Sequence, residues 1–213
     1  MLTVLIDYDS GNLHSAEKAF QRMARETDAG EVLVSSRPED VARADRLVLP
    51  GDGAFPACRA ALMRDREAVY EALVDAVETR GRPFLGICVG MQLMARQGHE
   101  YATVPGLGWI DGEVVGITPG DSRLKVPHMG WNDLVVDRPH PVLAGIETGD
   151  HAYFVHSYHM VMGAEDQLLA HCDYGERVTA VVGKGTTVGT QFHPEKSQGA
   201  GLRLISNFLT WRP

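Results

Sequence analysis

The sequence predicts an α/β fold in which a mostly parallel central sheet is flanked by helices, with antiparallel strands added in the second half. Three observations carry this prediction. In the first half, short apolar runs alternate with stretches of helical character, which is the pattern of βαβ units. After Gly98, β-like runs punctuated by glycine and proline replace the helices. The chain of 213 residues, 44% of them hydrophobic, is long enough to bury a sizeable core.

The first half contains four short apolar runs that are typical of buried strands, at residues 2–6, 31–35, 46–49 and 83–87. Pro50 and Gly51 are expected to end the third of them. Helices are predicted where a partial 3.6-residue period or helix-favouring residues follow, over residues 13–23, 58–80 and 89–97. Ser36 and Glu39 stand at capping-box spacing and predict a further helix start after the second strand.

The second half contains six β-like runs, at residues 109–117, 131–136, 153–162, 168–172, 178–182 and 186–191. A closing helix is predicted over residues 202–209. No internal repeat or low-complexity linker separates the two halves. We therefore expect residues 1–213 to form a single domain.

Charge and cysteine usage exclude several classes of protein. The formal net charge of −8 does not favour nucleic-acid binding. An odd, sparse set of cysteines is no disulfide framework, and without a CxxC pair a cysteine-based zinc site is not expected. The N-terminus lacks the basic flank and longer apolar run of a signal peptide, and no run approaches the ~18–20 apolar residues of a membrane span. These features favour a cytoplasmic protein that does not enter a membrane.

The clearest chemical signal is Gly86-Ile87-Cys88-Val89-Gly90, between a predicted strand and a predicted helix. This is the glycine-flanked nucleophile elbow of hydrolases, with cysteine as the nucleophile. A thiol at the start of a helix is favoured as thiolate, and the Val89 N–H is expected to face a developing oxyanion. The cysteines at 58 and 172 lack such a setting and are interpreted as core residues.

A thiolate nucleophile needs a base and a group that orients it. His193 and Glu195 are two residues apart near the end of the last predicted strand, with Pro194 between them. Proline fixes its own φ and favours an extended backbone at His193, so the Glu195 carboxylate can reach the imidazole. The pairing of His193 with Cys88 must come from the fold, because the two lie far apart in the sequence.

Two further segments are candidate parts of the site. Gly51 and Gly53 flank one residue at a strand end, which suits a second oxyanion donor, although an ordinary glycine-rich turn remains an alternative. His156, Ser157 and Tyr158 lie on a β-run, where alternation places Ser157 on the opposite face from its two neighbours. They suit polar recognition of an amino-acid head group, and a wet edge strand is the alternative.

Several motifs, in order from about residue 5 to the C-terminal helix, resemble the class I (triad-type) glutamine amidotransferases. The elbow continues into Met91-Gln92, and the base segment reads His193-Pro194-Glu195. Within that family, the chain resembles the glutaminase subunits of histidine biosynthesis at residues 7–13 (DYDSGNL), 50–55 (PGDGAF), 127–132 (PHMGWN), 153–158 (YFVHSY) and 192–197 (FHPEKS).

The resemblance implies a flavodoxin-like fold and the hydrolysis of glutamine to glutamate and ammonia, with no metal or organic cofactor. Cys88 would form a γ-glutamyl thioester, His193 would shuttle the proton, and Glu195 would orient His193. The backbone of the Gly51–Gly53 loop and of Val89 would form the oxyanion hole. The residues implied to hold glutamine are Gln92, His156, Ser157 and Tyr158.

The resemblance also implies a heterodimer with a cyclase subunit. Ammonia would pass to that partner, which makes imidazole glycerol phosphate and an aminoimidazole carboxamide ribotide. The glutaminase would be nearly silent until the partner binds its own ligand. The positions that match the partner interface are Asn12, Met129, Trp131, Tyr153 and Lys196.

One position departs from the family pattern. Asp52 stands between two glycines where a small apolar residue is usual. A carboxylate beside an oxyanion would be repulsive by about 1–4 kcal/mol at 4 Å. We therefore expect the Asp52 side chain to point away and only its backbone to contribute.

Three other classes of protein are alternatives. The first is an amidotransferase subunit that serves anthranilate, purine or pyridoxal synthesis. The 128–132 segment and the start at Asn12 favour the histidine pathway instead. The second is a cysteine peptidase or hydrolase of similar fold, which would not be expected to carry both Gln92 and His193-Pro194-Glu195. The third is a non-catalytic binding module, against which the intact set of Cys88, His193 and Glu195 argues.

Overall fold

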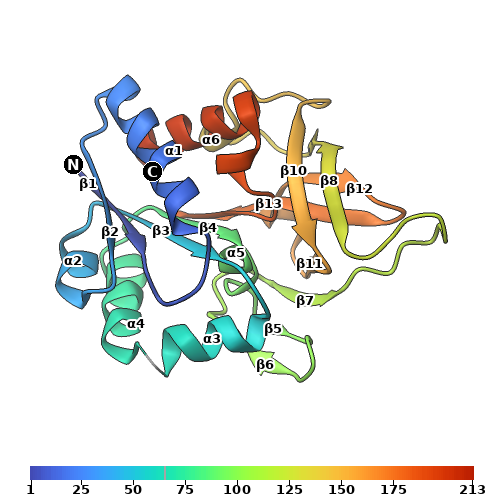
Figure 1. Ribbon diagram of the computed structural model, residues 1–213, viewed down its shortest axis with the longest axis horizontal. Coiled ribbons are helices and arrows are strands. Elements are labelled where there is room, and N and C mark those ends of the chain that lie inside the picture. The colour runs from blue at the N-terminus through green and yellow to red at the C-terminus, as the bar shows by residue number, and fades with distance from the viewer. Residues whose placement is uncertain (65) are drawn as a thin grey trace.

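The computed structural model describes residues 1–64 and 66–213. Its centre is an eight-stranded sheet with the order β2-β1-β3-β4-β14-β13-β12-β9. Figure 1 labels β1, β2, β3, β4, β12 and β13 of this sheet. The strands of this sheet are β1 (Leu2–Ile6), β2 (Glu31–Ser35), β3 (Arg46–Gly51), β4 (Phe84–Cys88), β9 (Val135–Val136), β12 (Leu168–Asp173), β13 (Arg177–Lys184) and β14 (Thr187–Thr190). The predicted α/β class, with parallel strands first and antiparallel strands later, is confirmed.

Five neighbouring strands, β2, β1, β3, β4 and β14, are parallel. Every residue of β1, β3 and β4 is buried, which is why these strands appear in the sequence as apolar runs without alternation. The third strand does not end before Pro50, as predicted, but continues to Gly51. Its pairing with β1 stops at Val48, so Pro50 has a partner strand on one side only, a setting in which a strand tolerates proline.

Helices cover both faces of the parallel strands. On one face lie α1 (Leu13–Thr27) and α6 (Gln198–Thr210), and on the other α2 (Pro38–Arg43), α3 (Phe55–Met63) and α4 (Glu67–Val74) (Figure 1). The closing helix is longer than predicted. No helix in the part of the chain that the structure describes is long and apolar enough to span a membrane.

Two helix predictions over residues 36–80 are wrong in detail. The helix after β2 has Arg37 as its N-cap and Pro38 in its first turn, because the residue before a proline is held extended. The predicted helix 58–80 is divided into α3 and α4, followed by a π-helical turn, η1 (Asp75–Thr79). Residue 65, inside the predicted helix, lies outside the described residues. Arg66, at φ −130° and ψ 43°, is not helical, so a new helix starts at Glu67.

The helix after β4 is also shorter than predicted. Instead of extending over 89–97, α5 (Val89–Gln92) makes one turn. The Arg96 N–H then donates to Gly112 O, and the chain enters β5 (Gln97–Gly98), which pairs with β7 (Gly112–Gly116). Tertiary strand pairing therefore overrides the local helix propensity.

The second half contributes two smaller sheets. One has the order β11-β7-β5-β6, with β6 (Val104–Pro105) and β11 (Tyr158–Met162), and the other pairs β8 (His128–Asp133) with β10 (His151–His156). Two runs predicted as single strands, 131–136 and 153–162, each change sheets midway. The first leaves β8 to enter β9, and the second leaves β10 at Ser157 to enter β11. Two of the short 3₁₀ turns in this half are η2 (Pro141–Leu143) and η3 (Glu165–Gln167).

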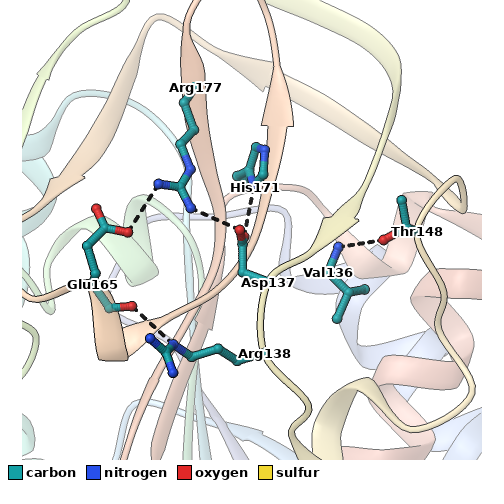
Figure 2. A network of polar contacts seen from close by, with 7 residues as sticks. All are labelled: Val136, Asp137, Arg138, Thr148, Glu165, His171 and Arg177. Carbon is teal, nitrogen blue, oxygen red and sulfur yellow. Dashed lines mark hydrogen bonds and ion pairs between the residues drawn. The ribbon is translucent and has the colours of Figure 1, made fainter.

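A polar network fastens the short strand β9 to the antiparallel edge of the large sheet (Figure 2). The Asp137 carboxylate contacts His171 Nδ1 at 2.7 Å and Arg177 Nη2 at 2.9 Å. Arg177 also bonds Glu165 at 3.1 Å. The hydroxyl of Thr148 accepts a hydrogen bond from the β9 backbone at 3.0 Å. These side chains reinforce the pairing of β9 with β12, which spans only two residues.

Candidate active site

Cys88 stands on a strained turn between β4 and α5. Its φ of 54° and ψ of −111° are rarely adopted by a residue with a side chain. The flanking glycines are required by space. A Cβ at Gly86 would lie 2.6 Å from Gly90 O, and one at Gly90 would lie 1.8 Å from Leu49 O. The chain therefore makes the sharp elbow that the motif predicts.

His193 and Glu195 follow β14. His193 directly precedes the 3₁₀ turn η4 (Pro194–Lys196), and Glu195 lies within this turn. His193 Nδ1 lies 2.9 Å from Glu195 Oε1, and both side chains are buried. Because a carboxylate can only accept, Nδ1 carries a proton and Nε2 is left for exchange with Cys88. Burial opposes a charged His193, but hydrogen bonds and charge interactions with Cys88 and Glu195 outweigh it and raise the pKa of His193 to about 9.

Two glutamine side chains connect the nucleophile to the neighbouring backbone. Gln191 Nε2 donates to Cys88 Sγ at 3.6 Å, and Gln92 Nε2 donates to Gln191 Oε1 at 3.1 Å. The second Nε2 proton of Gln92 goes to the Tyr158 carbonyl at 2.9 Å. Gln191 is fully buried and was not predicted as a site residue. The only signal for it is its position two residues before His193.

The thiol opens into a cavity of about 210 Å³. Its lining includes seven of the predicted site residues and one that sequence reasoning missed, Glu100, a buried residue whose Oε2 accepts from Phe55 N at 2.7 Å. A lone glutamate in a loop carries no motif, so only the fold could reveal it. The cavity is lined by Asp52, Gly53, Cys88, Val89, Gln92, Glu100, Pro127, Val155, His156, Ser157 and Tyr158.

The glycine-flanked loop at residues 51–53 is held in place by hydrogen bonds to Ser10. Ser10 Oγ donates to Asp52 O at 2.7 Å and accepts from Asp52 N at 3.2 Å. Gly53 has a φ of +107°, which favours glycine. Gly51 packs against the elbow, since a Cβ there would lie 2.6 Å from Gly90 N. The Asp52 N–H is thus engaged with Ser10, and Asp52 is an exposed residue in the cavity lining.

The residues at the junction of β10 and β11 all line the same cavity. The predicted alternation, with Ser157 on the opposite face, is wrong because the strand ends at His156 and a strand of another sheet begins at Tyr158. His156 is buried, and its Nδ1 lies 2.9 Å from Tyr158 O. Burial lowers the pKa of His156 to about 3, so the ring is neutral.

Four of the predicted interface residues lie on or beside the β8–β10 ribbon. Met129 and Trp131 on β8 are 62% and 47% exposed, and Trp131 meets Tyr153 of β10 edge to face at 5.8 Å. Lys196 lies in η4, which packs against β10. Asn12 is separate from this group, as the N-cap of α1, where its side chain accepts from Ser15 N at 3.4 Å.

The other two cysteines are buried free thiols. Burial raises the pKa of Cys58, and burial and the nearby Asp173 raise the pKa of Cys172 to about 12. Both are therefore poor nucleophiles. Within residues 1–64 and 66–213, no group of three or more His, Cys, Asp or Glu side chains could hold a metal ion.

Comparison with known proteins gives a consistent result. The family model of class-I glutamine amidotransferases matches residues 4–211. Subunits HisH of imidazole glycerol phosphate synthase from Cereibacter sphaeroides and Ruegeria pomeroyi are 71% and 68% identical to the chain, over the full length of both sequences. A crystal structure of a glutamine amidotransferase aligns with a TM-score of 0.70 at 21% identity, covering 97% of this chain and 96% of that one. This last likeness concerns the fold alone.

Proposed function

Because the chain belongs to the class-I glutamine amidotransferases, and within them to the HisH subunits of imidazole glycerol phosphate synthase, we propose that Cys88, His193 and Glu195 hydrolyse glutamine to glutamate and ammonia. The observation that carries this proposal is the arrangement of the three groups. A strained elbow holds the thiol in a cavity, and a buried carboxylate orients the imidazole that interacts with it.

The reaction is a double displacement. The Cys88 thiolate adds to the side-chain carbonyl carbon of glutamine, and the C–N bond breaks as His193 gives its proton to the leaving ammonia. The products of this half are ammonia and a γ-glutamyl thioester. Water then adds to the thioester, His193 takes its proton, and the C–S bond breaks to release glutamate. Glu195 holds His193 in the tautomer that both halves require.

The oxyanion of each tetrahedral intermediate needs backbone donors. The Val89 N–H, directly after the nucleophile, is one candidate, and the Gly51–Gly53 loop supplies the other. In this structure the Asp52 N–H donates to Ser10 Oγ. We infer that the loop must release Ser10 and turn this peptide toward the cavity for full activity. This requirement agrees with a glutaminase whose activity is low until the partner subunit is bound.

The cavity offers complementary groups for the head of glutamine. The Glu100 carboxylate suits the α-ammonium, since it is buried and one of its oxygens is already anchored by Phe55 N. Ser157 and Tyr158 line the cavity at the junction of β10 and β11, and Gln92 Nε2 donates to the Tyr158 carbonyl. The cavity volume of about 210 Å³ is sufficient for an amino acid such as glutamine.

The experiment that tests this function is labelling with a diazoketone analogue of glutamine. Its carbon should alkylate Cys88 with loss of dinitrogen, and mass spectrometry should find Cys58 and Cys172 unmodified. Glu100→Gln is expected to slow this labelling about tenfold or more, because the α-ammonium loses a charged partner. Iodoacetamide, which has no ammonium, provides the matched control and should react equally with both proteins. Equal slowing of both reagents, or labelling spread over all three cysteines, would refute the assignment.

The partner is proposed to be the cyclase subunit of imidazole glycerol phosphate synthase, in a heterodimer that receives the ammonia. The names of the relatives support the synthase. The exposed apolar side chains of Met129 and Trp131, beside the base segment, support a protein interface on this ribbon. We further infer that the whole chain acts as one amidotransferase domain, and that it works in the cytoplasm, where thiols such as Cys88 stay reduced.

Trp131→Ala is expected to weaken binding of the cyclase subunit by about 10- to 100-fold, as large aromatic residues dominate interface energies. Binding is measured by titration calorimetry. Val161 on β11, 48% exposed and thus similar to Trp131, is a matched control. Val161→Ala should bind normally, and both variants should keep the melting temperature of the isolated subunit. Unchanged binding in Trp131→Ala would contradict the assignment of this face.

A further inference from the structure

A chain of hydrogen bonds joins the β8 strand to the glutamine cavity. Asn132 Nδ2 lies 3.3 Å from His128 Nε2, and His128 Nδ1 lies 3.0 Å from His156 Nε2. His156 Nδ1 then meets Tyr158 O at 2.9 Å, the same carbonyl that accepts from Gln92. None of the roles assigned above uses His128.

The proton positions in this series of hydrogen bonds follow from the groups at its two ends, the Asn132 amide and the Tyr158 carbonyl. A carbonyl only accepts, so His156 carries its proton on Nδ1 and its Nε2 is an acceptor. His128 must therefore donate from Nδ1, and its Nε2 accepts from Asn132. The Asn132 amide is itself fixed, because Nδ2 also donates to Asp173 O at 3.0 Å and Oδ1 accepts from Asp133 N at 2.8 Å. Both rings are neutral, and the two ring nitrogens of each are bonded.

The His128 ring is also held on both faces. It is 2% exposed and stacks between Phe154, at 4.8 Å, and Tyr174, at 3.9 Å. His128 and His156 are register partners at one end of the β8–β10 ribbon. A ring fixed by stacking and by hydrogen bonds presents its Nδ1–H in one direction only.

We propose that His128 is a positioning residue for glutamine binding, which acts through His156 to hold the Tyr158 carbonyl and the adjoining cavity wall. The inference rests on the proposed function, since it takes the cavity as the glutamine site. If His128 loses its donor, His156 Nε2 is left without a partner in a buried place. The ring then has reason to shift toward another donor, which weakens its hydrogen bond to Tyr158 O and loosens the wall.

The test compares His128→Leu with His128→Asn in the complex with the cyclase subunit. Both remove the ring and its stacking, but the Asn amide can place a donor where Nδ1 stood. His128→Leu is expected to raise KM for glutamine about tenfold, the loss of one buried hydrogen bond, with kcat and iodoacetamide labelling of Cys88 within about twofold of wild type. His128→Asn should restore most of KM. An unchanged KM in His128→Leu, or the same KM in both variants, would overturn the proposal.

A second measurement needs no variant. Nitrogen-15 NMR of the histidine rings in the full chain should find both His128 and His156 as the Nδ1–H tautomer at neutral pH. If the spectra show either ring as Nε2–H or as imidazolium, the proposed series of hydrogen bonds is refuted, even if His128→Leu fails to fold. These spectra do not depend on turnover. A wild-type complex that leaves glutamine intact would therefore count against the proposed function and not against the proton positions.

Discussion

Replacing Cys88 with alanine is expected to lower glutamine hydrolysis by on the order of 10⁴- to 10⁶-fold, the loss typical of removing a nucleophile from a catalytic triad. No other thiol can replace it, because neither Cys58 nor Cys172 lines the cavity, and burial raises the pKa values of both. The measurement is glutamate release by the complex, with binding of glutamine followed separately. Binding should survive, since the cavity wall and Glu100 are untouched.

The matched control is Cys172→Ala, which removes a buried thiol from β12. It should lower the melting temperature slightly while leaving kcat unchanged. Residual activity in Cys88→Ala within a hundredfold of wild type would contradict a covalent mechanism on this residue.

The elbow also predicts that a larger residue cannot replace either glycine, because the spaces beside Gly86 and Gly90 are already filled by backbone.

The second large effect is expected at Glu195. Glu195→Gln keeps an acceptor for His193 Nδ1 but removes the negative charge, and kcat/KM should fall by about 10²- to 10⁴-fold. Hydrogen bonds and charge interactions with Cys88 and Glu195 raise the pKa of His193 to about 9, against the effect of burial. Since this shift is upward, the protonated ring is present below pH 9 and is lost as pH rises through that value. Wild-type activity should therefore decline above about pH 9.

Without the Glu195 charge the pKa of His193 falls, so the alkaline decline in Glu195→Gln should begin at lower pH. The pH dependence of kcat/KM for both proteins checks this shift. Glu71, an exposed carboxylate on α4, gives the matched control, and Glu71→Gln should keep both the rate and the pH profile. An alkaline limb in the same place in Glu195→Gln and wild type would show that Glu195 does not set the protonation of His193.

Much of the parallel half of the fold could be predicted because fully buried strands such as β1 and β4 appear in the sequence as apolar runs. Strands β1 and β2 begin and end where the apolar runs do, and β4 differs by one residue at each end. Errors came where tertiary contacts overrule local preference. The helix after Cys88 stops after one turn because Arg96 and its neighbours pair with β7. The single β-like run predicted at 153–162 divides because the chain changes sheets at Ser157.

The triad residues could be predicted because each lies in a motif with a physical reason for its spacing. Glu100, Gln191 and His128 could not, since each acts through a partner that is distant in the sequence. A hydrogen bond from Phe55 N holds the Glu100 carboxylate at the cavity. Gln191 contacts Cys88, which lies 103 residues before it in the sequence. His128 lies in a recognisable segment, but only the β8–β10 register shows that it faces His156.

The most direct test of the account is glutamate release from glutamine by this chain, alone and with a purified cyclase subunit and the nucleotide ligand of that subunit. We expect little release by the chain alone, where Ser10 holds the Asp52 peptide, and an increase by orders of magnitude when partner and ligand are both present. No release under either condition, while Cys88 can still be alkylated, would contradict the proposed glutaminase activity.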